Sequence, residues 1–98
     1  MEINKTFNEG TLFIGLKGRL DTITAPGLEN ELNDSLPGVT ELILDCAALE
    51  YVSSAGLRVI LAVQKVMNRQ GKMIVKNVND TTMEVFEITG FSDLLTIE

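Results

Sequence analysis

The stretch that decides the fold is residues 39–70, VTELILDCAALEYVSSAGLRVILAVQKVMNRQ. Its first part, residues 39–46, holds an unbroken Leu-Ile-Leu run, which predicts a short strand covered on both faces in a parallel sheet. From residue 54 the apolar residues recur every three or four positions, at Leu57, Ile60, Val63 and Met67, which is the period of a helix. Gly71 follows where such a helix is expected to end. A buried strand leading directly into a long helix favours an α/β fold.

Two alternating segments, residues 1–7 and 11–17, precede this stretch. The turn residues 8–10 between them predict an antiparallel hairpin. A helix follows, with Thr24 as the expected N-cap and Pro26 in the first turn. Its apolar face is marked by leucines one turn apart, at Leu28, Leu32 and Leu36.

After residue 71 the sequence predicts a strand over 72–76, a third helix closed by Gly90, and a last short strand over 94–97. Asn79 or Asp80 is the expected cap of that helix. The predicted order is ββαβαβαβ, with a mixed β-sheet opened by the N-terminal hairpin and packed with helices. The length fits a single domain over residues 1–98.

Composition excludes several classes of function. The chain has 98 residues with 8 Lys and Arg, 14 Asp and Glu, no histidine and one cysteine. Without histidine there is no Ser-His or Cys-His nucleophile, and the usual zinc ligands are missing, so no metal and no cofactor are expected. The net charge of −6 argues against nucleic acid or an anionic membrane as partner. The lone cysteine and the polar N-terminus predict a cytoplasmic protein.

Ligands of open α/β sheets collect where strands end and helices begin. Asp21 follows the second predicted strand, Asp45 is expected near the end of the third, and Ser53 and Ser54 open the long helix. We therefore expect these side chains to converge. Asp21 has a second interpretation, because aspartate often initiates a turn. Asp45 needs a partner, because a buried carboxylate is costly alone.

The serine pair also has two interpretations. A serine at a helix start normally accepts a backbone amide hydrogen bond as an N-cap. However, the small neighbours Ala55 and Gly56 leave a hydroxyl there accessible to another protein. A phosphate on it would meet free amides and the positive end of the helix dipole, with Arg58 one turn further on.

Two other features are open to a structural explanation. Arg58, Lys65 and Arg69 are expected to form a basic stripe opposite the apolar face of the long helix. Such a stripe is usually a solvated face, and its alternative is a contact patch for an acidic partner. Cys46 is expected to be a small buried hydrophobic residue.

Several motifs together resemble the STAS domains of the anti-sigma factor antagonist type, over essentially the whole chain. The first is Gly18-Arg19-Leu20-Asp21 with Thr24-Ala25-Pro26 after it. The second and more specific one is LILD at residues 42–45 followed by LEYVSSAGLRVIL at residues 49–61. Gly71-Lys72, Val85-Phe86 and Thr89-Gly90-Phe91 match the rest of the family pattern.

The resemblance implies an anti-sigma factor antagonist that works by partner switching. Its unphosphorylated form would bind an anti-sigma factor with serine kinase activity and free the sigma factor. Phosphorylation by that kinase would end binding, and a serine phosphatase would reverse it. The family position of the acceptor is Ser54, with Ser53 in reserve because relatives often carry aspartate there. Ala55 stands where others have serine or threonine. The implied partner-binding residues are Asp21, Thr24, Ser53, Ser54, Ala55, Gly56 and Arg58.

Three alternatives remain. A nucleotide hydrolase is disfavoured because the chain lacks a phosphate-binding glycine-rich loop and a histidine base, although weak nucleotide binding near Asp21 stays open. An aspartyl-phosphate receiver would need an acidic cluster with magnesium, and no acidic pair adjoins Asp21 or Asp45. A STAS module could also be a non-switching scaffold in a signalling or lipid-transport assembly. We expect a substrate of a kinase and a phosphatase, not an enzyme.

Overall fold

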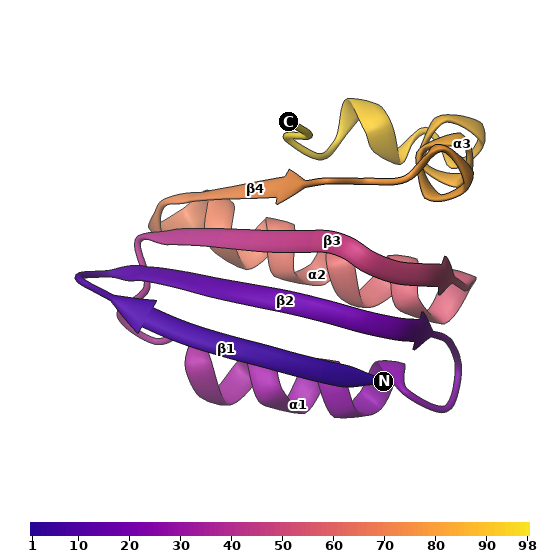
Figure 1. Cartoon of the computed structure of the whole chain (residues 1–98). Coiled ribbons are helices and arrows are strands. Elements are labelled where there is room, and N and C mark those ends of the chain that lie inside the picture. The colour runs from indigo at the N-terminus through magenta and orange to yellow at the C-terminus, as the bar shows by residue number, and fades with distance from the viewer.

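The computed structural model describes residues 1–98 as a four-stranded mixed sheet with helices (Figure 1). Strands β1 (Glu2–Asn8) and β2 (Thr11–Leu20) form an antiparallel hairpin. Strands β3 (Glu41–Val52) and β4 (Lys72–Lys76) continue the sheet in parallel with β2, in the spatial order β1-β2-β3-β4. Helix α1 (Ala25–Ser35) connects β2 to β3, and α2 (Ser54–Gln70) connects β3 to β4. Helix α3 (Asp80–Thr89) and the short 3₁₀ helix η1 (Phe91–Asp93) end the chain.

The hairpin turn and the helix ends form where the sequence predicts them. Glu9 and Gly10 both have positive φ angles, 49° and 85°, which is the mirror-image turn that two-residue hairpins favour. Asn79 caps α3 by accepting a hydrogen bond from the amide of Thr82 at 2.7 Å. Gly90 ends that helix in the left-handed conformation. None of the helices is long and apolar enough to cross a membrane.

Both crossover helices, α1 and α2, cover the same face of the sheet (Figure 1). The strand order advances in one direction through β2, β3 and β4, and right-handed crossovers then place every connecting helix on one side. The side chains of β3 that point to this side are buried, as Leu42, Leu44 and Cys46 show. The core is one continuous cluster, so the sheet and both helices form a single packed unit. Burial raises the pKa of the Cys46 thiol to about 12, which keeps it protonated.

The prediction that β3 is covered on both faces is wrong. Its alternate residues Ile43 and Asp45 are only half-buried, because no helix packs over them. The register places Phe13, Ile43 and Ile74 side by side across this uncovered side of the sheet. The Leu-Ile-Leu run therefore belongs to a strand with one face in the core and one face partly open to solvent.

Two predicted element ends also differ. Strand β3 continues to Val52 and does not stop at Cys46, with irregularities in its pairing with β2 that let Leu49 and Val52 turn into the core. The last strand over 94–97 is reduced to one parallel bridge between Val75 and Ile97, because η1 occupies the residues just before it.

Gly71 follows α2 as predicted, but for a different reason. Its φ of 173° is an extended conformation that any residue can adopt. A Cβ atom there would instead overlap the backbone carbonyl of Thr40. Close packing of the α2–β4 turn against the start of β3 therefore requires glycine.

Candidate functional site

The carboxyl ends of β2 and β3 bring the two predicted motifs together. Because these strands are parallel and Leu20 pairs with Val52, the residues that follow them, Asp21 and Ser53, leave the sheet side by side. The amide of Ser53 donates a hydrogen bond to the carbonyl of Leu20 at 2.8 Å. This confirms that the start of α2 and the loop after β2 form one surface.

Gly56 is what allows α2 to begin so close to β2. A Cβ atom at this position would lie 2.6 Å from Cγ and 2.9 Å from the carbonyl oxygen of Leu20. Leu20 is fully buried, so it has little room to move away. The glycine of the Ser-Ser-Ala-Gly motif therefore serves close packing of α2 on β2, and through it the position of both serines.

The two serines have different environments. Ser53 is the N-cap of α2, half-buried, and its hydroxyl accepts a hydrogen bond from the amide of Gly56 at 3.3 Å. Ser54 is the first residue of the helix and is exposed, and no hydrogen bond within the chain involves its hydroxyl. The capping interpretation thus applies to Ser53, and the accessible hydroxyl belongs to Ser54. Ala55 is half-buried beside it, and Arg58 is exposed one turn further along.

The carboxylate of Asp21 organises the loop that faces Ser53. Its Oδ1 accepts hydrogen bonds from the amides of Ile23 and Thr24 at 3.0 and 3.1 Å. The hydroxyl of Thr24 accepts a hydrogen bond from the amide of Asp21 at 2.9 Å and donates to the carbonyl of Arg19 at 2.8 Å. Thr24 is the N-cap residue of α1, as predicted, but its side chain makes no capping bond to the helix. The turn-initiating interpretation of Asp21 is therefore confirmed.

These hydrogen bonds set the acidity of Asp21. The amide of Thr24, with help from that of Ile23 and from Arg19, holds the pKa of the Asp21 carboxyl below its usual range. A depressed folded-state pKa contributes stability above the unfolded-state pKa, and this stability is lost as the pH falls through the folded-state value.

We expect Asp21→Asn to reduce the loss of stability of the protein in acid. The amide keeps an acceptor oxygen for the turn but no longer titrates. The free energy of unfolding, measured by urea denaturation, should therefore fall less for Asp21→Asn than for the wild type between about pH 5 and about pH 2. Parallel pH profiles for the two proteins would contradict this assignment.

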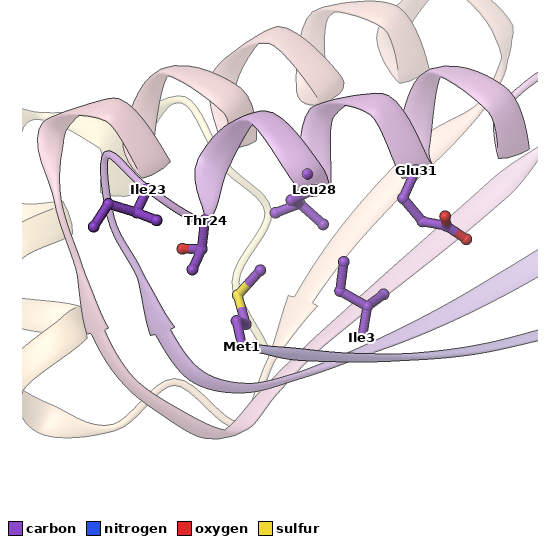
Figure 2. Close-up of a pocket in the computed structure, with 7 residues that line it drawn as sticks. Met1, Ile3, Ile23, Thr24, Leu28 and Glu31 are labelled. Atoms are coloured by element: carbon purple, nitrogen blue, oxygen red, sulfur yellow. The ribbon is translucent and has the colours of Figure 1, made fainter.

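An apolar feature adjoins the loop and is not singled out by the sequence. Ile23 is 88% exposed between Asp21 and Thr24. On the other side of Thr24, a hollow of about 370 Å³ lies between α1 and the start of β1. Figure 2 shows Met1, Ile3 and Leu28 turned towards one another around it. An isolated isoleucine in a polar loop is the signal that could have marked this side of the surface.

An arginine–tyrosine pair sits at the ends of the two strands. The guanidinium of Arg19 lies 4.4 Å from the centre of the Tyr51 ring, and its Nε is 3.9 Å from Oδ2 of Asp21. Both residues are exposed, Tyr51 to 41%. They add an aromatic ring and a positive charge beside Asp21.

Asp45 does not join this site. It lies within β3, next to Gly15 on one side and Lys76 on the other, because the strand continues well past it. Its Oδ1 accepts hydrogen bonds from the side-chain amide of Asn77 at 3.0 Å and the amide of Ala47 at 2.9 Å. The Asn77 side chain, then the Ala47 amide, lowers the pKa of the Asp45 carboxyl. The expected partner of this carboxylate is thus structural.

Comparisons with known proteins identify the family of the chain. The STAS domain family matches residues 2–98. BtrV of Bordetella bronchiseptica is 36% identical over 91 residues, which cover 91% of this chain and 78% of BtrV. The anti-sigma-B factor antagonist of Listeria monocytogenes is 31% identical over 88 residues, which cover 87% of this chain and 76% of that protein.

Among solved structures, the Bacillus anti-sigma factor antagonist SpoIIAA has the same fold. Its unphosphorylated form matches with a TM-score of 0.78 at 19% identity, over 99% of this chain and 87% of SpoIIAA. Its phosphorylated form also matches with a TM-score of 0.78, at 20% identity, over 99% of this chain and 91% of SpoIIAA.

Proposed function

Because this chain belongs to the STAS domain family, we propose that it is an anti-sigma factor antagonist controlled by phosphorylation of Ser54. Its unphosphorylated form binds an anti-sigma factor with serine kinase activity, and the sigma factor is released. The kinase then phosphorylates Ser54, the complex dissociates, and a serine phosphatase restores the first state. In this cycle the chain is a substrate and a regulator, not a catalyst.

The observation that carries this proposal is the exposed, unbonded hydroxyl of Ser54 beside the Asp21 loop. A kinase needs access to the hydroxyl, and Ser54 offers it while Ser53 holds the helix cap. A phosphate on the first residue of α2 lies at the positive end of the helix dipole, so the helix tolerates it. That SpoIIAA matches equally well in its phosphorylated and unphosphorylated forms supports a switch without a change of fold.

The same geometry explains how one phosphate ends binding. We assign the contact surface to the Asp21–Thr24 loop, the start of α2 with Ser53, Ser54 and Ala55, and the exposed Arg58, while the buried Gly56 acts only by holding α2 against Leu20. Phosphorylation adds about −1.5 to −2 charges and a bulky group at its centre. In the complex the phosphate would lose its hydration next to the negative Asp21 carboxylate. This cost favours dissociation of the partner.

Kinase assays on matched serine variants test the acceptor. With ATP and the anti-sigma factor kinase encoded in the same genome, we expect the wild type and Ser53→Ala to become phosphorylated and Ser54→Ala to stay unmodified. Intact-mass and peptide mass spectrometry measure this directly. Phosphate mapped to Ser53, or none on any of the three proteins, would refute the proposal.

Ser53→Ala also provides a structural control. Losing the N-cap hydrogen bond to Gly56 should lower the free energy of unfolding by about 1 kcal/mol. Ser54→Ala, which removes no hydrogen bond, should change it by less than about 0.5 kcal/mol. Thermal denaturation thus separates the capping role from the acceptor role.

A further inference from the structure

Helix α2 has three exposed positive side chains, and only one of them, Arg58, belongs to the proposed contact surface. Arg58, Lys65 and Arg69 are exposed, and the helix contains no acidic residue. None of the three takes part in an ion pair, whereas Lys5, Lys17, Arg19 and Lys72 each face a carboxylate. With a net charge of −6 for the whole chain, the three charges on α2 leave −9 for the rest.

These three residues form one row that starts at Ser54. Spacings of four, seven and eleven residues return to the same side of a helix, so Ser54, Arg58, Lys65 and Arg69 point in nearly the same direction. The row is roughly 22 Å long. We call the surface formed by Arg58, Lys65 and Arg69 the basic face.

Apolar side chains border the basic face. Ala62 is exposed and Val66 is 40% exposed on the side that turns towards α1. They line a shallow groove between the two helices, together with the core residues Leu36, Val59 and Val63, and Glu29 and Asn33 of α1 form its far side. A partner lying along the row would therefore find both charge and apolar contact.

We propose that the basic face is a docking surface for an acidic face of the anti-sigma factor kinase, so this inference rests on the proposed function. A protein patch of matching length can meet one row of cations while avoiding the acidic remainder of the chain. Long polyanions, such as nucleic acid or an anionic membrane, would meet that remainder as well. The charge distribution thus favours a protein partner.

The position of the row adds a second effect of phosphorylation. A phosphate on Ser54 lies one turn from Arg58 and can pair with it. The phosphate would then reduce the positive potential of the basic face, in addition to disrupting the contact surface around Ser54. Phosphorylation should therefore slow association with the partner as well as speed dissociation.

Charge reversal at Lys65 tests the docking surface against a matched reversal at Lys17. Both lysines are exposed, but Lys17 lies on β2, away from the row. For the unphosphorylated chain and the kinase in about 50 mM salt, we expect Lys65→Glu to weaken binding roughly tenfold, mainly through the association rate. Lys17→Glu should stay within about twofold, and the effect of Lys65→Glu should shrink at about 500 mM salt.

The outcomes separate this inference from the proposed function. If the kinase binds and phosphorylates Ser54 but Lys65→Glu and Lys17→Glu bind with equal affinity and salt dependence, the docking surface is wrong and the function stands. Lys65→Gln, expected to show a smaller loss than Lys65→Glu, and unchanged circular dichroism exclude misfolding as the cause.

If the kinase neither binds nor phosphorylates the chain, the proposed function fails, and a second experiment tests the docking surface independently. Amide shifts along α2 on adding a synthetic glutamate-rich helical peptide, absent in Lys65→Glu, would still support an acidic protein as occupant. Absence of these shifts would reject it. Binding of single-stranded DNA or of anionic phospholipid vesicles that Lys65→Glu abolishes would also overturn the choice of partner.

Discussion

Ser54→Asp is expected to weaken binding to the anti-sigma factor kinase by roughly 10- to 100-fold, while the fold stays intact. A permanent carboxylate at the first position of α2 imitates part of the phosphate charge in the middle of the proposed contact surface. Each factor of ten corresponds to about 1.4 kcal/mol of binding free energy, which one uncompensated charge at an interface can supply. Isothermal titration calorimetry measures the affinity, and circular dichroism with thermal denaturation monitors the fold.

Two further variants make this result specific. Ser54→Ala should bind as tightly as the wild type and remain bound in the presence of ATP, because it cannot be phosphorylated. Ser53→Asp places the same charge one residue earlier, where the half-buried side chain accepts the Gly56 amide hydrogen bond, and should weaken binding less than Ser54→Asp. An affinity of Ser54→Asp equal to that of the wild type would rule out a charge-based switch at this residue.

Gly56→Ala is expected to destabilise the protein by about 2 to 3 kcal/mol. The added methyl group has no space between the start of α2 and Leu20, so the helix or the end of β2 must shift. For a domain of this size, 1 kcal/mol corresponds to roughly 4–8 °C in Tm, so thermal denaturation should show a drop of about 10 °C or more. Because the shift moves Ser54 relative to Asp21, phosphorylation by the kinase should also slow.

Gly27→Ala is the matched control for this prediction. Gly27 is also near the amino end of a helix, but nothing lies within 4 Å of a Cβ atom placed there. Alanine in a helix should therefore be neutral or stabilising by up to about 1 kcal/mol. Equal losses of stability in Gly27→Ala and Gly56→Ala would show that the overlap with Leu20 is not the cause of the loss at Gly56.

The parts of the fold that the sequence predicts well are those with a local physical cause. The apolar period of residues 57–67 defines α2 without reference to the rest of the chain, whereas Gly71 is required by its close approach to Thr40. The carboxyl ends of parallel strands meet at one edge of a sheet, so the approach of Asp21 and Ser53 follows from topology.

The features that were missed depend on tertiary contacts. Strand β3 is long because its pairing with β2 shifts register between Gly15 and Arg19 of β2. These shifts leave no pattern in the sequence of β3 itself. Asp45 is therefore predicted near the end of β3 but lies well within the strand. Either Asp21 or Thr24 could cap a helix by its chemistry, but in the folded loop Asp21 bonds the turn amides of Ile23 and Thr24 and neither side chain caps α1.

The thiol of Cys46 should not react with thiol-directed labels while the protein is folded. The side chain is buried in the core and is the only sulfhydryl of the chain, and its raised pKa keeps the reactive thiolate scarce. A cysteine introduced on the surface can thus carry a fluorophore or spin label without first removing the native one. The rate at which a thiol reagent modifies Cys46 then measures how often the core opens.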